Sequence, residues 1–437
     1  MFFVSLIFVL QFFLILIIML YTFFRRGVNF KTGIAFGVLF FIFIPVWIMI
    51  STGTLELSRM DFHYTTLPDI IYNESINSSR TLIAFLFSII LYLYFPSRYS
   101  PNVEASIFRP NFKGYLILYI IGMLIIFIGS GLLDGGDWYQ NRESFMQTEG
   151  ALAVLVVFIV NSVKILIISS LFYKWAIKSI SFNKLIFFAS SFIIFDMIFS
   201  GNRIYLFVTS ILIILSFFKR YPKTTLISFP FLLPIIYAFG YFASIFRHIR
   251  GPLFSSGLPS YETFTKALTR AMALEPPSIK LFFIGISESI NLNLIYSLFN
   301  NFNDFLLGAT YIKPLFFYVP RSIWGAKPES ITVIAADMYG GASLVTTIIG
   351  EIFMNFSFYG LIILPVLLWF TDAFITISLK PYGLLSSIIG FFFGVLFFRM
   401  PFSDEILVFI FLVLILWFFN IFKKYRFIVS RNDNYKK

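Results

Sequence analysis

The sequence predicts an all-α membrane protein that crosses the bilayer about eleven times, and three observations support this prediction. Of the 437 residues, 59% are hydrophobic, 21% are aromatic and only 12% are charged, and the mean hydropathy is +0.89. These values lie far outside those of soluble globular domains. Apolar runs long enough to span recur along the chain without a Gly- or Ser-rich linker between them. We therefore expect residues 1–437 to form a single integral membrane domain.

The spans follow from the positions of the apolar runs. The first run is too long for the core of a signal peptide and lacks a basic start, so we interpret it as a retained span. The predicted spans are 2–24, 33–51, 81–96, 114–133, 151–173, 184–199, 203–218, 224–245, 345–371, 383–398 and 405–422.

The orientation follows from the positive-inside rule. Alternate connections carry an excess of Lys and Arg, beginning with Arg25, Arg26 and Lys31, and the tail after residue 422 is also strongly basic. These segments are predicted to be cytoplasmic, which places the N-terminus outside and the C-terminus inside. In the connection 371–382, the charges of Asp372 and Lys380 cancel. Only the alternation of spans therefore assigns this connection to a side of the membrane.

One connection, 246–342, is predicted to be external and is unusually long. It contains eight Lys or Arg and six Asp or Glu, but loops longer than about 60 residues translocate largely regardless of charge. Within it, 260–274 begins at a plausible Ser N-cap and has the spacing of an amphipathic helix, and a second helix is expected over 292–307. We expect a helical cap over an outward-facing cavity.

Composition excludes several kinds of chemistry. The chain has no Cys and only two His, so disulfides, thiolate sites and His-rich metal sites are not expected. No phosphate-binding Gly-rich loop, dinucleotide fingerprint or HExxH motif occurs. The net charge of +12 is explained by the predicted cytoplasmic connections rather than by nucleic-acid binding. We therefore expect no metal, no cofactor and no nucleic-acid partner.

Ionisable residues within or at the ends of spans are candidates for function, because a charge at mid-helix costs about 2.5–3.5 kcal/mol on insertion scales. They are Lys164, Asp196, Arg203, Glu351 and Arg399. Lys164 and Asp196 could simply form a structural ion pair. Arg203 follows Gly-Asn in a turn between two short spans, where its guanidinium suits a phosphate, although an arginine reaching for lipid headgroups is the alternative.

Glu351 is the main candidate carboxylate. Ser343, Thr347, Glu351 and Asn355 recur every four residues, so they lie on one face of a helix. A buried carboxylate near arginines can be an ion-pair partner or a general base with an adjusted proton affinity, and both roles remain open at this point.

Further cations are predicted to lie on the outer side. Arg321 and Lys327 belong to the segment 318–328, Tyr-Val-Pro-Arg-Ser-Ile-Trp-Gly-Ala-Lys-Pro. Arg142 follows a Trp-Tyr-Gln-Asn run. His248 lies between Arg247 and Arg250, and it could act as a base near neutral pH or only contact headgroups. An outward-facing cationic site requires an anionic ligand.

The order of these motifs resembles the O-antigen polymerase (Wzy) family of bacterial repeat-unit polymerases. The resemblance covers about 138–360 and rests on three features. They are the Gly-Asn-Arg turn ending at Arg203, the long external connection ending in Pro-Arg-Ser-Ile-Trp-Gly-Ala-Lys-Pro, and the helix with Gly350-Glu351, Asn355 and Gly360.

The resemblance implies a GT-C-like, metal-independent glycosyltransferase of the bacterial inner membrane, with its site facing the periplasm. It would transfer a growing glycan from undecaprenyl pyrophosphate to the non-reducing end of an incoming lipid-linked repeat unit, with a Wzz-type regulator of chain length as partner. On this interpretation Arg203 and Arg321 hold the pyrophosphate, and Glu351 or else His248 takes the proton. The assisting cations would be Arg142, Arg247, Arg250 and Lys327.

Two other functions remain possible at this level. An O-antigen ligase shares the architecture and usually relies on an external His, and His248 could be that residue. A flippase for the same lipid-linked units is the alternative from another class, but the chain shows no internal repeat.

Overall fold

The computed structural model describes residues 2–55, 67–95, 110–130, 150–200, 204–224, 234, 237, 241, 260–273, 278–319, 323–339 and 345–434. Nearly all of this is helix, as predicted, and the only sheet among these residues is the short antiparallel pair β1 (Thr54–Leu55) and β2 (Ile70–Ile71). The fold class of an all-α polytopic membrane protein is therefore supported.

The long helices in the first half of the chain are α1 (Phe2–Arg26), α4 (Ile76–Tyr94), α5 (Phe112–Gly129), α7 (Gly150–Ala176), α8 (Phe182–Ser200) and α9 (Ile204–Arg220). Between α1 and α4, helix α2 (Phe30–Val38), a π-helical turn (Leu39–Phe43) and α3 (Ile44–Thr52) run on as one stretch. Pro45 at the start of α3 lacks the N–H of a regular helix, which fits a change of helical geometry at this point.

The second half contains mostly short helices and two long ones. The shorter ones are α11 (Tyr261–Met272), α12 (Ile279–Ile286), α13 (Ile290–Asn301), α14 (Ala309–Ile312), the 3₁₀ turn η3 (Lys313–Phe316) and α15 (Ile331–Met338). Then follow α16 (Thr347–Phe356), a turn η4 (Ser357–Tyr359), α17 (Gly360–Leu379), a turn η5 (Lys380–Tyr382), α18 (Leu384–Leu396) and α19 (Phe402–Asn434).

Seven helical stretches in the described part of the chain are long and apolar enough to cross a membrane, or eight if the bent pair α12 and α13 is one span. They overlap the predicted spans 2–24, 33–51, 81–96, 114–133, 151–173, 345–371 and 405–422. The predicted spans 203–218 and 383–398 are helical but shorter, as Ile204–Phe218 and Leu384–Leu396. The predicted span 184–199 is helical within α8, and 224–245 lies almost wholly outside the described residues.

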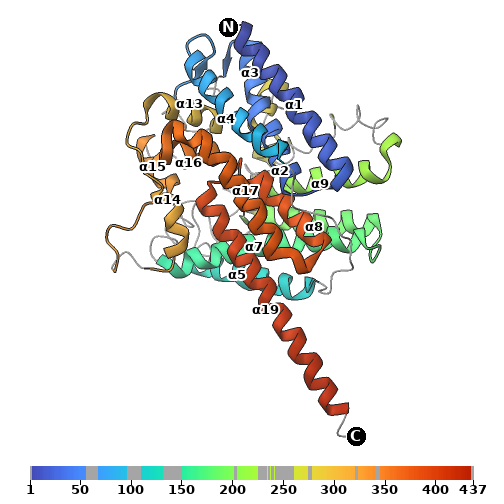
Figure 1. Ribbon diagram of the computed structural model, residues 1–437. Coiled ribbons are helices and arrows are strands. Elements are labelled where there is room, and N and C mark those ends of the chain that lie inside the picture. Colours follow the sequence, from blue (N-terminus) through green and yellow to red (C-terminus); the bar gives the residue numbers. More distant parts are fainter. Residues whose placement is uncertain are drawn as a thin grey trace.

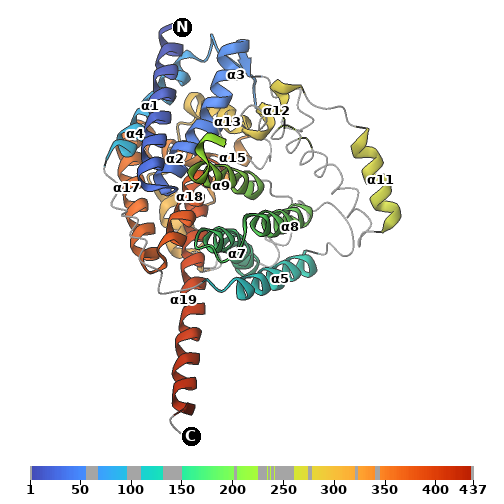
Figure 2. The ribbon, with the colours of Figure 1, turned by 90° about the vertical axis from the view of Figure 1, so that its right-hand side faces the viewer.

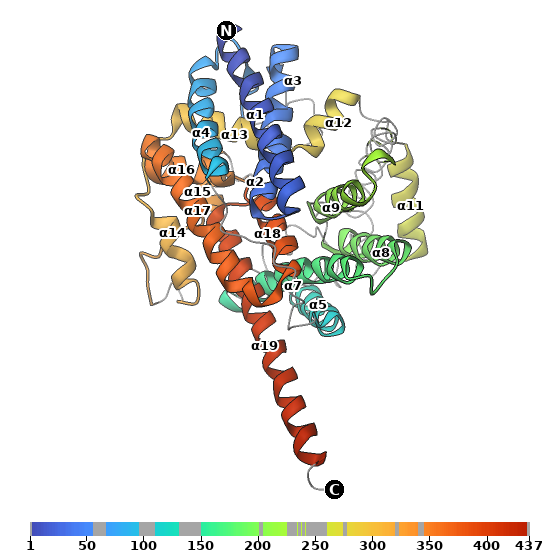
Figure 3. The ribbon, with the colours of Figure 1, turned by 45° about the vertical axis from the view of Figure 1, so that its right-hand side comes forward.

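The helices run in two main directions. Helices α1 and α19 lie roughly along one direction, with the N-terminus at one end and the C-terminal part of α19 projecting at the other (Figure 1). Helices α5, α7 and α8 run across that direction, as the turned views show (Figures 2 and 3). The assignment of each connection to a side of the membrane stays a prediction.

Helices α2 and α18 cross closely because glycines face each other there. A Cβ atom on Gly33 would lie 2.4 Å from the carbonyl oxygen of Phe391, and one on Gly394 would lie 2.4 Å from that of Phe30. Small residues allow such close backbone approach between membrane helices, where packing rather than the hydrophobic effect drives association. These glycines therefore hold two segments together that are separated by most of the chain.

The predicted structural pair of Lys164 and Asp196 is confirmed. The Lys164 Nζ lies 2.7 Å from Asp196 Oδ1, and each side chain is only 2% exposed. Tyr119 also donates a hydrogen bond of 2.7 Å to the same carboxylate oxygen. The pair joins α7 to α8, and the Tyr119 hydroxyl adds α5, so the two charges stabilise packing among the crossing helices.

The connection predicted as external contains both an exposed and a buried helix. Helix α11 begins where predicted, with the Ser260 Oγ accepting from the Thr263 N–H at 3.1 Å. The second helix was predicted over 292–307, but α13 ends at Asn301, where Phe302 is extended and a polar run with Asn303 and Asp304 follows. All residues from 291 to 298 are buried, so α13 is part of the packed interior.

Candidate functional site

Glu351 lies in the interior and links three segments. Its side chain is fully buried in α16. Oε1 accepts a hydrogen bond of 3.0 Å from the Thr310 hydroxyl in α14, and Oε2 accepts one of 3.2 Å from the backbone N–H of Ser403 in the first turn of α19. A carboxylate at the N-terminus of a helix satisfies an N–H that has no partner within the helix and interacts favourably with the helix dipole.

The polar face predicted around Glu351 is present in the described part of α16. Thr347, Glu351 and Asn355 are all fully buried, while Ser343 lies outside the described residues. The Asn355 side-chain amide donates to the Thr310 hydroxyl at 2.8 Å and to the Glu351 carbonyl at 2.8 Å. Thr310 therefore connects Asn355 to the Glu351 carboxylate.

The described residues provide Glu351 with hydrogen bonds but with no ion pair. The other charge that acts on it is a second carboxylate, Asp404, one residue after Ser403. Of the two roles considered from the sequence, the ion-pair role would need a cation beside Glu351, and the described part of the chain provides none. Arg203, the cation considered with it, lies outside the described residues.

A second charged contact lies close to Glu351. Arg399 forms an ion pair with Glu288, which sits in the bend between α12 and α13. The segment that carries Arg399 is fixed to α16, because the Ile348 N–H donates to the Phe397 carbonyl at 2.9 Å. Arg399 and Glu351 therefore belong to one polar region, built from the α12–α13 bend, the first half of α16 and the residues 397–405.

Several buried polar groups of this region have no hydrogen-bond partner. Among them are the hydroxyls of Thr346, Thr347 and Ser403 and both carboxylate oxygens of Glu405. All four side chains are at most 1% exposed. Thr347 also has φ = 56°, an uncommon value for a β-branched residue, at the first position of α16. Unpaired polar groups and strained backbone are concentrated at functional sites more than elsewhere.

Lys327 closes the cationic segment on itself. Its ammonium donates to the carbonyls of Phe317 and Val319 at 2.9 and 2.8 Å. The Trp324 ring packs edge-on against Phe316 at 5.6 Å, so aromatic contacts also hold the segment. Lys327 therefore links the residues before α15 to those just after η3, while Arg321 lies outside the described residues.

Most of the predicted site residues lie outside the described part of the chain. These residues are Arg142, Arg203, Arg247, His248, Arg250 and Arg321. Of the predicted set, the structure describes Glu351 and Lys327. Both are connected to the segment that starts at α14, since Thr310 binds Glu351 and the chain then continues through η3 to the turn closed by Lys327.

No protein-family model matches the chain, and neither a curated protein nor a solved structure does.

Among the described residues no three His, Asp or Glu side chains gather as they would around a metal ion. The carboxylates near Glu351 are instead placed at the start of α19, where Asp404 and Glu405 occupy the first turn. Acidic side chains in that position interact favourably with the helix dipole.

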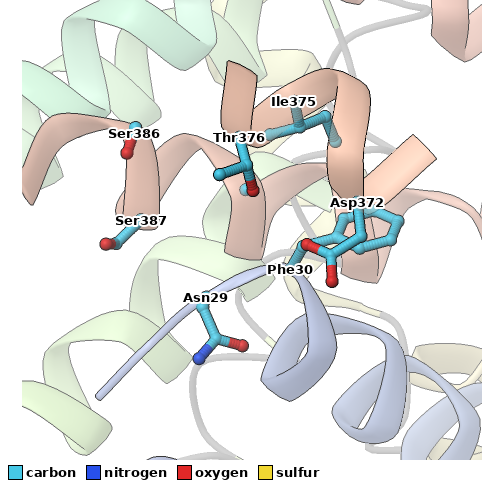
Figure 4. Close-up of a pocket in the computed structure, with 8 residues that line it drawn as sticks. Asn29, Phe30, Asp372, Ile375, Thr376, Ser386 and Ser387 are labelled. Carbon is cyan, nitrogen blue, oxygen red and sulfur yellow. The ribbon is translucent and has the colours of Figure 1, made fainter. Parts of the chain in front are cut away.

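A small hollow lies elsewhere, between α2, α17 and α18 (Figure 4). Its polar lining includes Asn29, Asp372 and Ser386. Asn29 caps α2 and Ser386 donates to the Gly383 carbonyl at 2.7 Å, so both have structural partners. Asp372 interacts electrostatically with Lys31. Asp372 thus lies near the start of α2, and the side of the membrane on which 371–382 lies stays a prediction.

Sequence reasoning missed Glu288 and Glu405. Glu288 was assigned to an external loop, yet it lies between two apolar helices, Ile279–Ile286 and Ile290–Asn301. Together these are long and apolar enough to cross a membrane, with a bend of 67° between them. A hydropathy window over 279–299 could have revealed this. Glu405 was taken as the first residue of a span, where an acidic residue is common, and its burial could not be read from the sequence.

Proposed function

We propose that this protein is a polysaccharide repeat-unit polymerase, a glycosyltransferase of the bacterial inner membrane. It would transfer a growing glycan from undecaprenyl pyrophosphate to an incoming lipid-linked repeat unit at the outer face, within a GT-C-like fold. The proposal rests on the order of the sequence motifs that resemble the O-antigen polymerase family. The membrane-protein fold is consistent with it.

One structural observation supports the proposal most directly. The segment from Thr310 to Lys327 contacts the buried carboxylate of Glu351 through Thr310, and Lys327 at its end binds the carbonyl of Phe317. It is also anchored on α19, because the Phe317 ring lies 5.3 Å from that of Phe411. Glu351 and Lys327, two residues of the predicted site, are thus linked through one segment of the chain.

The proposed reaction needs cations for the leaving group and a base for the acceptor. An acceptor hydroxyl oxygen attacks the anomeric carbon, the bond from that carbon to the pyrophosphate oxygen breaks, and undecaprenyl pyrophosphate leaves. Arg203 and Arg321 would neutralise the charge that develops on it, with Arg142, Arg247 and Arg250 assisting. Lys327 would assist as well, and in the structure its ammonium donates to the carbonyls of Phe317 and Val319.

The hydroxyl proton would pass to Glu351 or, as the second candidate, to His248. The hydrogen bonds from Thr310 and Ser403 give the Glu351 carboxylate a fixed orientation, which a general base requires. The proposed partners are the undecaprenyl-pyrophosphate-linked oligosaccharide, membrane lipid and a Wzz-type regulator of chain length.

A deletion strain tests the proposal. Loss of the polymer ladder, with a single repeat unit still attached to its final acceptor, is the expected result. Accumulation of full-length polymer on undecaprenyl pyrophosphate would instead indicate a ligase. Accumulation of single units on the cytoplasmic leaflet would indicate a flippase. Either of the last two results would overturn the polymerase assignment.

A further inference from the structure

The bend between α12 and α13 places irregular backbone inside an apolar pair of helices. The two helices differ in direction by 67°. The bend contains Ser287, Glu288 and Ser289, and Glu288 has φ = 48°, in the left-handed region. Irregular backbone at membrane depth is tolerated where it is buried in protein or lines a polar cavity. Broken membrane helices frequently mark the site where a ligand binds.

Arg399 meets this bend through an ion pair, and its buried Nε forms no hydrogen bond. Its Nε pairs with the Glu288 carboxylate, and the two side chains are 27% and 21% exposed. The two terminal nitrogens of Arg399 form neither a hydrogen bond nor an ion pair with any residue in the described part of the chain. A guanidinium held through Nε keeps its two terminal amino groups in a planar fork, the geometry that binds two oxygens of a phosphate.

A second unpaired donor lies at the same bend. Asn291 is 2% exposed, and its side-chain Nδ2 has no hydrogen-bond partner. Its backbone N–H donates to the Glu288 carbonyl at 2.9 Å, which places Asn291 within the turn that holds the Arg399 partner. A buried amide nitrogen without an acceptor costs free energy unless a ligand or water accepts its hydrogen bond. The two unpaired groups are both donors, so they suit an oxyanion.

The charges around Arg399 leave its fork available. Glu351, in α16, already accepts from Thr310 and from Ser403. Asp404, at the start of α19, interacts electrostatically with Lys313 of η3. Glu288 therefore is the one carboxylate in the described part of this region that pairs with Arg399, and it does so through Nε.

We propose that Arg399 binds a phosphate group at the α12–α13 bend, with Glu288 as the residue that orients its guanidinium. The ligand class is a lipid-linked phosphate. That it is the pyrophosphate of a polyprenyl carrier rests on the proposed function. The headgroup of an anionic phospholipid has the same chemistry and is the other source. On this assignment Arg399 adds a cation to the predicted site from a connection, 399–404, that the predicted topology also places outside.

The competing explanation is that the Arg399–Glu288 pair only holds the bend in shape. Removal of either partner would then have the same effect, because each would leave the bend without its ion pair. The phosphate site predicts a difference. Substitution of Arg399 removes the cation that binds the phosphate. Substitution of Glu288 leaves that cation in place, and only the contact that orients its guanidinium is lost.

The experiment measures lipid binding to purified protein by native mass spectrometry, with undecaprenyl pyrophosphate and phosphatidylglycerol as separate probes. Arg399→Gln is expected to weaken undecaprenyl pyrophosphate binding about tenfold or more, as loss of a charge-assisted bidentate contact implies. Arg399→Lys keeps the charge and the pairing with Glu288 but loses the fork, so it should bind at an intermediate level. Glu288→Gln is the matched control and should lose no more than a few fold.

Melting temperatures of the three variants separate binding from folding. Arg399→Gln and Glu288→Gln break the same ion pair, so similar melting temperatures with unequal binding support the phosphate site. Equal binding by Arg399→Gln, Arg399→Lys and the wild type would overturn it. If the wild type binds only phosphatidylglycerol, and does so through Arg399, the phosphate site stands and the polymerase proposal fails. If the wild type binds neither probe, both fail.

Discussion

The Glu351 carboxylate in α16 accepts a hydrogen bond from the Ser403 backbone N–H in α19, which lies 52 residues further along the chain. The same carboxylate accepts from Thr310, 41 residues earlier. A single buried side chain thus joins three segments, and its substitution affects both stability and any reaction at this site.

Glu351→Ala should lower the melting temperature of the purified protein, because the Thr310 hydroxyl and the Ser403 N–H would be left buried without an acceptor. Each unpaired group costs roughly 1–3 kcal/mol. Glu351→Gln retains one acceptor oxygen and should be less destabilised. A polymer ladder from a stable Glu351→Gln variant would show that Glu351 positions the site and is not the base. An Ala variant that melts like the wild type would contradict the linking role.

Arg203→Ala and Arg321→Ala should each abolish polymer while protein level and membrane insertion stay normal, since the proposed leaving group carries the charge that these residues neutralise. Gel analysis of the polymer and immunoblots of membrane fractions measure both quantities. The pyrophosphate assignment is wrong if both variants still make a normal ladder.

Lys164→Ala should destabilise strongly, by about 3–5 kcal/mol, because it leaves Asp196 charged and unpaired in the interior. The double variant Lys164→Ala/Asp196→Ala should recover part of the loss, and a double-mutant cycle of thermal unfolding measures the coupling. Lys266→Ala is the control. Its pair with Glu262 is 73% and 75% exposed, so the melting temperature should not change measurably. Equal effects at positions 164 and 266 would contradict the burial of the first pair.

Gly394→Leu should prevent stable folding in the membrane. A Cβ atom there would lie 2.4 Å from the Phe30 carbonyl oxygen and 2.7 Å from the Ile34 nitrogen, so backbone atoms would have to move. Gly325→Ala meets no atom within 4 Å and serves as the control. Size-exclusion profiles of the extracted proteins distinguish the two. A Gly394→Leu protein with a normal profile would show that the α2–α18 crossing is not as close as described.

Single cysteines test the predicted topology, because the natural chain contains none. One cysteine replaces Lys266 in α11, whose side chain is 73% exposed. In spheroplasts, an impermeant maleimide should label this cysteine. Ser430→Cys, in the basic tail, should react only after the inner membrane is permeabilised. Labelling of position 430 from outside would reverse the predicted orientation.

Particular residues show how far sequence reasoning reached. The Lys164–Asp196 pair and the burial of Glu351 were predictable, because an ionisable side chain within a span must face protein or water. The start of α11 was predictable from Ser260, because capping depends on neighbouring residues only. The Arg399–Glu288 pair was not predictable, since its partners are far apart in sequence and Glu288 had been assigned to a loop.

The sequence by itself determined that this is a helical membrane protein, where most of its long helices lie, and which charges require an explanation. Those properties depend on apolar length and on the cost of placing a charge in lipid, both of which are local. Only the tertiary structure decided that Glu351 accepts from Thr310 and Ser403, that Lys327 closes its own turn and that α13 is buried. Such contacts depend on how distant segments meet, and the local pattern of a chain does not specify that.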